Sequence, residues 1–135
     1  MNTNDFKPEW ISQGITVQAV NFAEKLGEFL CDKQHDGRAG RLAMTTSQIR
    51  NFFGEIKRIQ AKGYDKEISS FLLIRPKLAY AEARVKSKTA NSRIEDFRKV
   101  MEKAHVSVQN STQFQNFVDF LEAVLAYHKA AGGKD

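Results

Sequence analysis

The chain has 135 residues, of which 41% are hydrophobic and ten are Phe, so one domain with a substantial apolar core is expected. Only two Pro and eight Gly argue against a loop-rich or all-β protein, and the single cysteine, Cys31, excludes an internal disulfide. No apolar run approaches the roughly 18 residues that cross a bilayer, and the polar N-terminus is unlike a signal peptide. The composition therefore predicts a cytoplasmic protein without a membrane partner.

Positive charge is concentrated in the middle of the chain. The formal net charge is +5 and the sequence pI is about 9.4. Residues 33–103 contain 17 Lys and Arg against 8 Asp and Glu, whereas the rest of the chain contains 4 against 8. This asymmetry indicates a polyanionic partner for the middle of the chain, such as a nucleic acid. A solvated basic surface without such a partner is the alternative.

The N-terminal third predicts a leader, a helix and a loop. We expect residues 1–14 to form a flexible leader that Trp10 and Ile11 anchor to the core. Thr16 can cap a helix that runs to about Cys31, because apolar residues then recur at helical spacing. The next segment, DKQHDGRAGR at 32–41, has two Gly and no apolar period, which predicts a basic loop.

The segment from Thr45 to Gly63 predicts a long amphipathic helix. Thr45 and Gln48 have the spacing of a capping box, and Gly63 is suited to end the helix. The apolar stripe of this helix consists of Ile49, Phe52, Phe53, Ile56 and Ile59.

Pro76 interrupts the next helical pattern. Proline lacks an amide donor and disfavours a helical residue before it, so we expect a break or kink near residues 74–75 and renewed helix over 78–86. Ser92 and Glu95 have the spacing of a second capping box, which would begin another helix.

The last helix should begin at Ser111 or Thr112 and end at the Gly pair 132–133. No segment shows sustained strand-type alternation. The sequence therefore predicts an all-α fold: a single-domain bundle of about five helices, one kinked at Pro76. The domain would span residues 15–131, followed by a tail at 132–135.

Residues suited to catalysis or metal binding are isolated from one another. His35, His105 and His128 lack the i,i+4 spacing of a helical zinc pair, and His35 has no nucleophile near it in sequence. Cys31 is better explained as a small buried apolar residue than as a nucleophile. We therefore expect no catalytic residue, no metal ligand, no cofactor and no enzymatic activity.

Basic residues recur on helix faces. Arg50 and Lys57 are seven residues apart with Gly54 between them, and Lys77, Arg84 and Lys88 follow at steps of seven and four. Gly54 would let a ligand backbone come close, although simple tolerance or a helix–helix contact explains it equally well. Tyr80 can stack on a base, although a partly buried core position is the commoner role. The candidate nucleic-acid-binding residues are Arg41, Arg50, Lys57, Arg58, Lys77, Arg84 and Lys88.

Two segments resemble a known family. LAMTTSQIRNFFGEIKRIQ (42–60) and FLLIRPKLAYAEAR (71–84) are similar to the signature segments of the small subunit of the type III-A CRISPR interference complex, the Csm complex. The resemblance covers residues 20–130 in layout and is specific at the level of motifs over 42–84. The leader and the 32–41 loop take no part in it.

The resemblance implies a small, all-helical, non-catalytic subunit. Copies would stack along the complex beside the crRNA–target RNA duplex and contact the backbone and large subunits, which carry the catalytic activities. It assigns Arg50, Lys77 and Arg84 to RNA binding, and the charge pattern alone adds Lys57 and Arg58. Phosphate contacts of this kind would hold RNA of any sequence.

Two alternatives stay open at this point. A basic helical DNA-binding domain would present Gln48, Arg50 and Asn51 at the first turn of a recognition helix. A protein-only assembly subunit would use its charges for protein partners and assemble without salt sensitivity.

Overall fold

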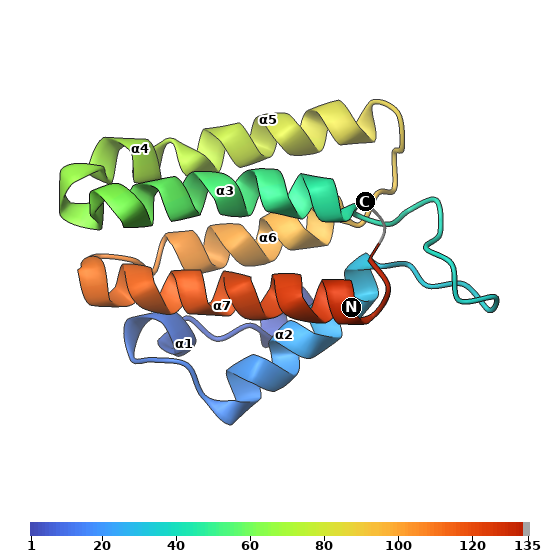
Figure 1. The fold of residues 1–135 in the computed structure, drawn as a ribbon, viewed down its shortest axis with the longest axis horizontal. Helices are drawn as coiled ribbons and strands as arrows, with labels where there is room; N and C mark the ends of the chain where they lie inside the picture. The colour runs from blue at the N-terminus through green and yellow to red at the C-terminus, as the bar shows by residue number, and fades with distance from the viewer. Residues whose placement is uncertain (134–135) are drawn as a thin grey trace.

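The computed structural model describes residues 1–133 and is built from helices and the segments that connect them, as expected from the sequence. Five long helices make up most of this part of the chain, and the shorter pieces connect them (Figure 1). The elements are η1 Thr3–Asp5, α1 Glu9–Ser12, α2 Val17–Leu30, α3 Thr46–Lys62, η2 Tyr64–Lys66, α4 Ile68–Leu72, α5 Ile74–Lys86, α6 Ile94–His105 and α7 Ser111–Ala130. Within residues 1–133 the only strand-like feature is an isolated bridge between Lys33 and Ala39.

Helix α7 is the central element of the bundle. It packs against α1, α2 and α3, while α5 packs on α6. In Figure 1, α3 and α7 run side by side across the front, with α5 above α3. The buried faces of all five long helices form one apolar core, to which α7 contributes Phe114, Phe117, Val118, Phe120, Leu121 and Val124. This packing leaves one side of α3 and one side of α5 facing each other at the surface.

The first residues of the chain pack onto this core. Trp10 and Ile11 are buried, as the anchor prediction required, and Phe6 is buried with them. The Phe6 ring lies edge-on to Trp10, with centroids 5.4 Å apart, and 5.3 Å from the ring of Phe120 on α7. The anchor is therefore confirmed, and the mobility of residues 1–14 stays a prediction.

Two of the three predicted helix caps are present. Thr16 accepts a hydrogen bond from the Ala19 amide, and Thr45 and Gln48 form the reciprocal capping box of α3. The box predicted at Ser92 and Glu95 is wrong. Arg93 is the residue before α6 and has no side-chain cap, while Glu95 forms an ion pair with Lys86 at 2.8 Å instead.

The helix breaks close to where Pro76 predicted. Leu73 separates α4 from α5, and Pro76 lies in the first turn of α5, where its missing amide requires no acceptor within that helix. The next amide, that of Lys77, already donates to the carbonyl of Leu73 at 3.1 Å. The angle of a kink at this point stays a prediction.

The 32–41 loop projects from one end of the bundle in Figure 1 but is fixed at its base. Asp32 has a φ of 46°, and its carboxylate accepts from the Leu42 amide at 3.0 Å and pairs with Arg93 at 3.1 Å. A Cβ at Gly40 would lie 2.2 Å from this carboxylate, so the turn requires glycine there. Helix α3 therefore begins from a fixed point, which orients its exposed face.

Candidate nucleic-acid interface

A surface groove runs between α3 and α5 and brings three of the predicted basic residues together. Its volume is about 650 Å³, and we call it the α3–α5 groove. Lys77, Arg84 and Lys88 line it, because steps of seven and four residues place them on the same side of α5 and its C-terminal extension. The other lining residues are Met44, Gln48, Asn51, Phe52, Glu55, Ile74, Leu78, Ala81, Val85, Ser87, Thr89 and Ile94.

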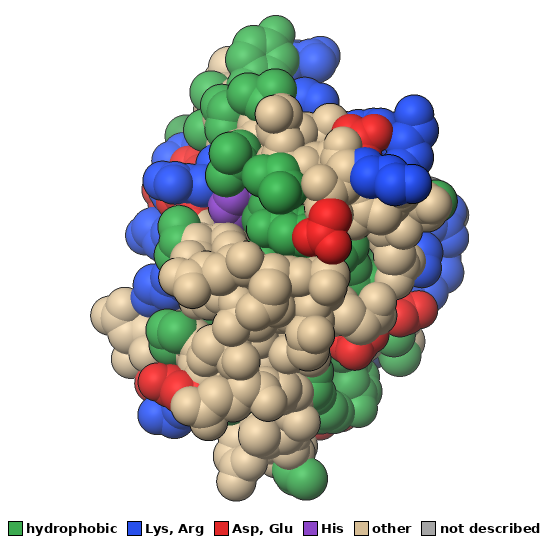
Figure 2. All heavy atoms as spheres, turned by 90° about the vertical axis from the view of Figure 1, so that its left-hand side faces the viewer, with side chains coloured by type: hydrophobic (Ala, Val, Ile, Leu, Met, Phe, Trp, Pro, Cys, Tyr) green, Lys and Arg blue, Asp and Glu red, His purple; other side chains and the backbone are tan. Residues whose placement is uncertain are grey.

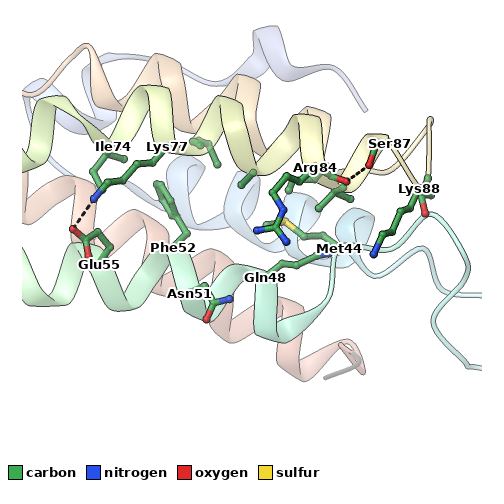
Figure 3. A pocket seen from close by; sticks show the side chains of 15 residues that line it. Met44, Gln48, Asn51, Phe52, Glu55, Ile74, Lys77, Arg84, Ser87 and Lys88 are labelled. Carbon is green, nitrogen blue, oxygen red and sulfur yellow. Dashed lines mark hydrogen bonds and ion pairs between the residues drawn. The ribbon is translucent and has the colours of Figure 1, made fainter.

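The basic side chains reach across the groove from α5. Figure 3 shows Lys77 extending toward Glu55 of α3 at one end, and Arg84 extending toward Gln48 and Met44 at the other. Lys88 points into the same end of the groove as Arg84. Within the described chain no carboxylate forms an ion pair with Arg84 or Lys88. This end of the groove therefore carries uncompensated positive charge.

Glu55 compensates the opposite end of the groove. Its carboxylate lies 2.9 Å from Arg58 and 3.4 Å from Lys77. The hydrogen bond from Arg58, with further help from Lys77, lowers the pKa of Glu55, so the carboxylate stays charged. Arg58 also lies 3.7 Å from Glu67. Two of the predicted RNA-binding residues are thus already engaged with carboxylates in the absence of RNA.

Sequence reasoning missed the role of Glu55, although part of it could have been found. The i,i+3 spacing of Glu55 and Arg58 on one helix is a recognisable ion-pair signal. The pair with Lys77 joins α3 to α5 across 22 residues of sequence, so only the packing of the two helices reveals it.

Three further predicted residues lie outside the groove. Arg50 and Lys57 are exposed on the solvent side of α3, and Arg41 is exposed just before this helix. The Lys57 ammonium lies 5.8 Å from the centroid of the Phe53 ring. A Cβ added at Gly54, between Arg50 and Lys57, would meet nothing within 4 Å. The helix–helix explanation of Gly54 is therefore wrong, and this part of α3 is an open surface.

Cations on the neighbouring α5–α6 side are paired. Lys86 contacts Glu95 and Glu82, and Arg98 pairs with Glu82 and Glu102. The hydrogen bond to Glu95 raises the pKa of Lys86, so its charge is firmly held in this pair. Two of these ion pairs join α5 to α6. Lys86 and Arg98 are therefore less available to a ligand than Arg84 and Lys88 are.

Tyr80 is not a core residue. Its side chain is 66% exposed, whereas its helical spacing favoured a partly buried position. The Arg84 guanidinium lies 5.9 Å from the centroid of the Tyr80 ring. Ile68 and Leu72 on α4, and Leu73 between α4 and α5, are also exposed. Figure 2 shows apolar side chains gathered at the upper end of the molecule, the side on which Figure 1 draws α4 and α5. Basic side chains lie on both flanks of these apolar side chains.

The residues considered for catalysis lie apart from the groove. His105 and His128 are buried, and Cys31 is buried and donates a hydrogen bond from its Sγ to the His128 carbonyl at 3.1 Å. Burial raises the pKa of the Cys31 thiol, which opposes a thiolate. Over residues 1–133 we find no cluster of three His, Cys, Asp or Glu arranged to hold a metal ion. None of the helices in that range combines the length and apolar character of a membrane span.

Comparison with known proteins identifies the family. The sequence model of the family described as Csm2 Type III-A matches residues 18–134, which is most of the chain. No curated protein and no solved structure gives a significant match. The matched region contains all of α2 but its first residue, α3 to α7 and both motif segments, and with them every residue that lines the α3–α5 groove. The chain therefore belongs to the Csm2 Type III-A family, the structural small subunit of the type III-A CRISPR Csm complex.

Proposed function

We propose that this subunit is a non-catalytic RNA-binding scaffold of the Csm complex, acting in the cytoplasm in antiviral defence. Its basic face lies along the crRNA–target RNA duplex beside the backbone subunits, and the subunit also contacts the large subunit. Arg84 and Lys88 in the α3–α5 groove contact phosphates, and Arg50, Lys57 and Arg41 extend the contact along α3. Lys77 and Arg58 contribute only in part, because Glu55 competes with RNA for them.

The observation that carries this proposal is the uneven pairing of the cations. Arg84 and Lys88 converge on one groove with no carboxylate partner among residues 1–133, whereas Lys86, Arg93 and Arg98 are held in ion pairs. Unpaired cations on a fixed helix face are what sequence-independent binding to a phosphate chain requires. The duplex varies in sequence, so a reader of base edges would be of no use here.

One copy alone binds weakly on this account. If about three of these cations neutralise phosphates at one time, the salt slope per copy is about −2, using the coefficient for single strands. Copies that stack along one RNA raise the affinity through effective concentration without any new contact. The acidic ends of the chain supply a complement to the basic middle of the next copy, as a head-to-tail contact requires.

The test is a charge reversal in the assembled complex. Lys57→Glu together with Arg84→Glu should weaken RNA retention and flatten its dependence on salt, measured at two or more salt concentrations. Circular dichroism of the free subunit should show unchanged helical content. The matched control is Lys25→Glu with Lys99→Glu, which changes the net charge equally but lies on α2 and α6. Equal RNA affinity in wild type and double variant would contradict the proposal.

One of the three residues of the DNA-reading alternative is already partly engaged in this structure. The Oε1 atom of Gln48 accepts from the Thr45 amide at 2.9 Å in the capping box, so it is occupied. Equal affinity of the free protein for duplex DNA and RNA would favour this alternative. Salt-insensitive assembly without RNA crosslinks would favour a protein-only subunit.

A further inference from the structure

The floor of the α3–α5 groove is apolar, which phosphate binding alone does not require. Met44, Ile74, Leu78 and Ile94 are buried beneath the groove and line it. Phe52 and Val85 are half-buried above them. A pocket of about 650 Å³ with an apolar floor and a few polar groups has the form and size of a small-molecule site.

The polar groups stand at the rim of this floor. Arg84 and Lys88 flank one end, and the Lys77–Glu55 pair bridges α5 and α3 at the other (Figure 3). Glu55 is the only carboxylate among the lining residues, and it is already engaged by Arg58 and Lys77. A ligand that enters therefore meets an apolar surface bounded by positive charge at one end.

We propose that the α3–α5 groove holds one unpaired nucleotide of an RNA strand. The base lies on the apolar floor beside Phe52, and its phosphate lies between Arg84 and Lys88. This inference rests on the proposed function, because it assumes that RNA follows this face. It adds that one nucleotide leaves the base stack here, since a stacked and paired base cannot present its flat face to a protein.

The charge pattern favours a nucleotide over a purely apolar ligand. Three cations and one carboxylate line the groove, so an anionic group would meet complementary charge there. A base supplies the flat apolar surface that the floor fits, and it does so whatever its identity, since every base has a π-face. The site therefore remains independent of sequence.

The experiment compares RNA with and without bases on the full-length protein. An unstructured 12-nucleotide RNA, the same strand with abasic positions throughout, a blunt RNA duplex and free AMP are titrated at low salt. We expect the intact single strand to bind about tenfold more tightly than the abasic strand. The duplex should bind like the abasic strand, and free AMP should bind far more weakly than the intact strand.

Two matched variants test the floor without altering charge. Ala81→Leu places a larger side chain in the groove, and Ala83→Leu makes the same change on the exposed side of α5, outside the groove. Ala81→Leu should remove the advantage of the intact strand over the abasic strand, and Ala83→Leu should keep it. Arg84→Ala should weaken both strands alike. Thermal melts verify that each variant is folded.

The failure of this inference can be told apart from failure of the proposed function. Equal binding of intact and abasic strands by the wild-type protein overturns the nucleotide site and leaves phosphate binding standing, and this comparison needs no variant. If free AMP binds as tightly as the intact strand, the groove is a site for a free nucleotide and not for a nucleotide within an RNA strand. If the protein binds neither strand, both the nucleotide site and the RNA-binding function are overturned.

Discussion

His105 and His128 are held in the core as neutral rings. The Nε2–H of His105 donates to the Phe71 carbonyl at 2.6 Å, and that of His128 donates to the Met44 carbonyl at 2.7 Å. Burial lowers the pKa of both imidazoles, and it outweighs the hydrogen bonds to carbonyl groups, which raise the pKa. The Nδ1 atom of His128 has no hydrogen-bond partner within the described structure, so a proton there would be buried without compensation.

We therefore predict that acid destabilises the fold before its carboxylates protonate. Below the ordinary imidazole pKa of 6.5 the unfolded chain binds protons that the folded chain excludes, so the free energy of unfolding falls with falling pH. Each histidine contributes a loss of about 1.4 kcal/mol per pH unit until its lowered folded-state pKa is reached. Urea unfolding between pH 7 and pH 5 measures this slope.

Glutamine substitutions assign the slope to the two rings. His105→Gln and His128→Gln retain a donor near the Nε2 position, so each should remove about half of the pH dependence. His35→Gln, in the exposed 32–41 loop, is the control and should leave the dependence unchanged. Equal slopes in the wild type and in the variant that lacks both buried histidines would show that they do not titrate on unfolding.

At the scale of the helix, the sequence predicted elements better than their ends. The apolar periods gave five long helices, because burial of a periodic face dominates the free energy of an element. The two capping-box spacings look alike in sequence, yet only Thr45 and Gln48 form the box. Glu95 is drawn away by Lys86 of the neighbouring helix, a competition that spacing along one helix cannot reveal.

Gly54 offers a test of what approaches α3. A Cβ at this position meets nothing within 4 Å, so Gly54→Ala should stabilise the helix by about 1 kcal/mol and raise Tm by about 3 °C. The same substitution should weaken RNA retention by the assembled complex if the strand lies close to this face, as the proposed function requires. Thermal melts and RNA binding measure the two effects separately.

Gly27→Ala is the contrasting variant within the bundle. A Cβ there would lie 2.7 Å from the backbone nitrogen of His128, so α2 and α7 would have to separate and Tm should fall.

A rise in Tm for Gly54→Ala with unchanged RNA affinity would mean that no ligand comes close to α3 at this point.

At the scale of the whole molecule, the sequence identified the basic residues but not which of them are free. Helical spacing correctly grouped Lys77 and Arg84 on α5 with Lys88, just beyond its C-terminal end, along one groove. It could not reveal that Glu55 engages Lys77 or that Asp32 engages Arg93, because these pairs join elements that are distant in sequence. A count of Lys and Arg along the chain therefore overstates the number of cations that are free to contact a ligand.

Glu55 should thus restrain RNA binding, which leads to a prediction opposite in sign to the usual loss-of-function test. Glu55→Gln removes a carboxylate that holds Lys77 and Arg58, so both cations become available to phosphates. We expect tighter RNA binding at low salt and a salt slope steeper by about 0.7 to 1.4, since each additional phosphate contact adds about 0.7. The upper value requires Arg58 to leave Glu67 as well. Titrations at a series of salt concentrations measure the slope.

The control for this prediction makes the same change of charge on another side of the molecule. Glu95→Gln removes the nearer of the two carboxylates that pair with Lys86, which lies on the α5–α6 side and does not line the α3–α5 groove. Both variants raise the net charge by one, so a general electrostatic effect would strengthen RNA binding equally in both. A steeper slope in Glu55→Gln alone locates the phosphates at the groove. Equal slopes in the two variants would mean that RNA senses only the total charge, and that the convergence of Lys77, Arg84 and Lys88 has no part in holding it.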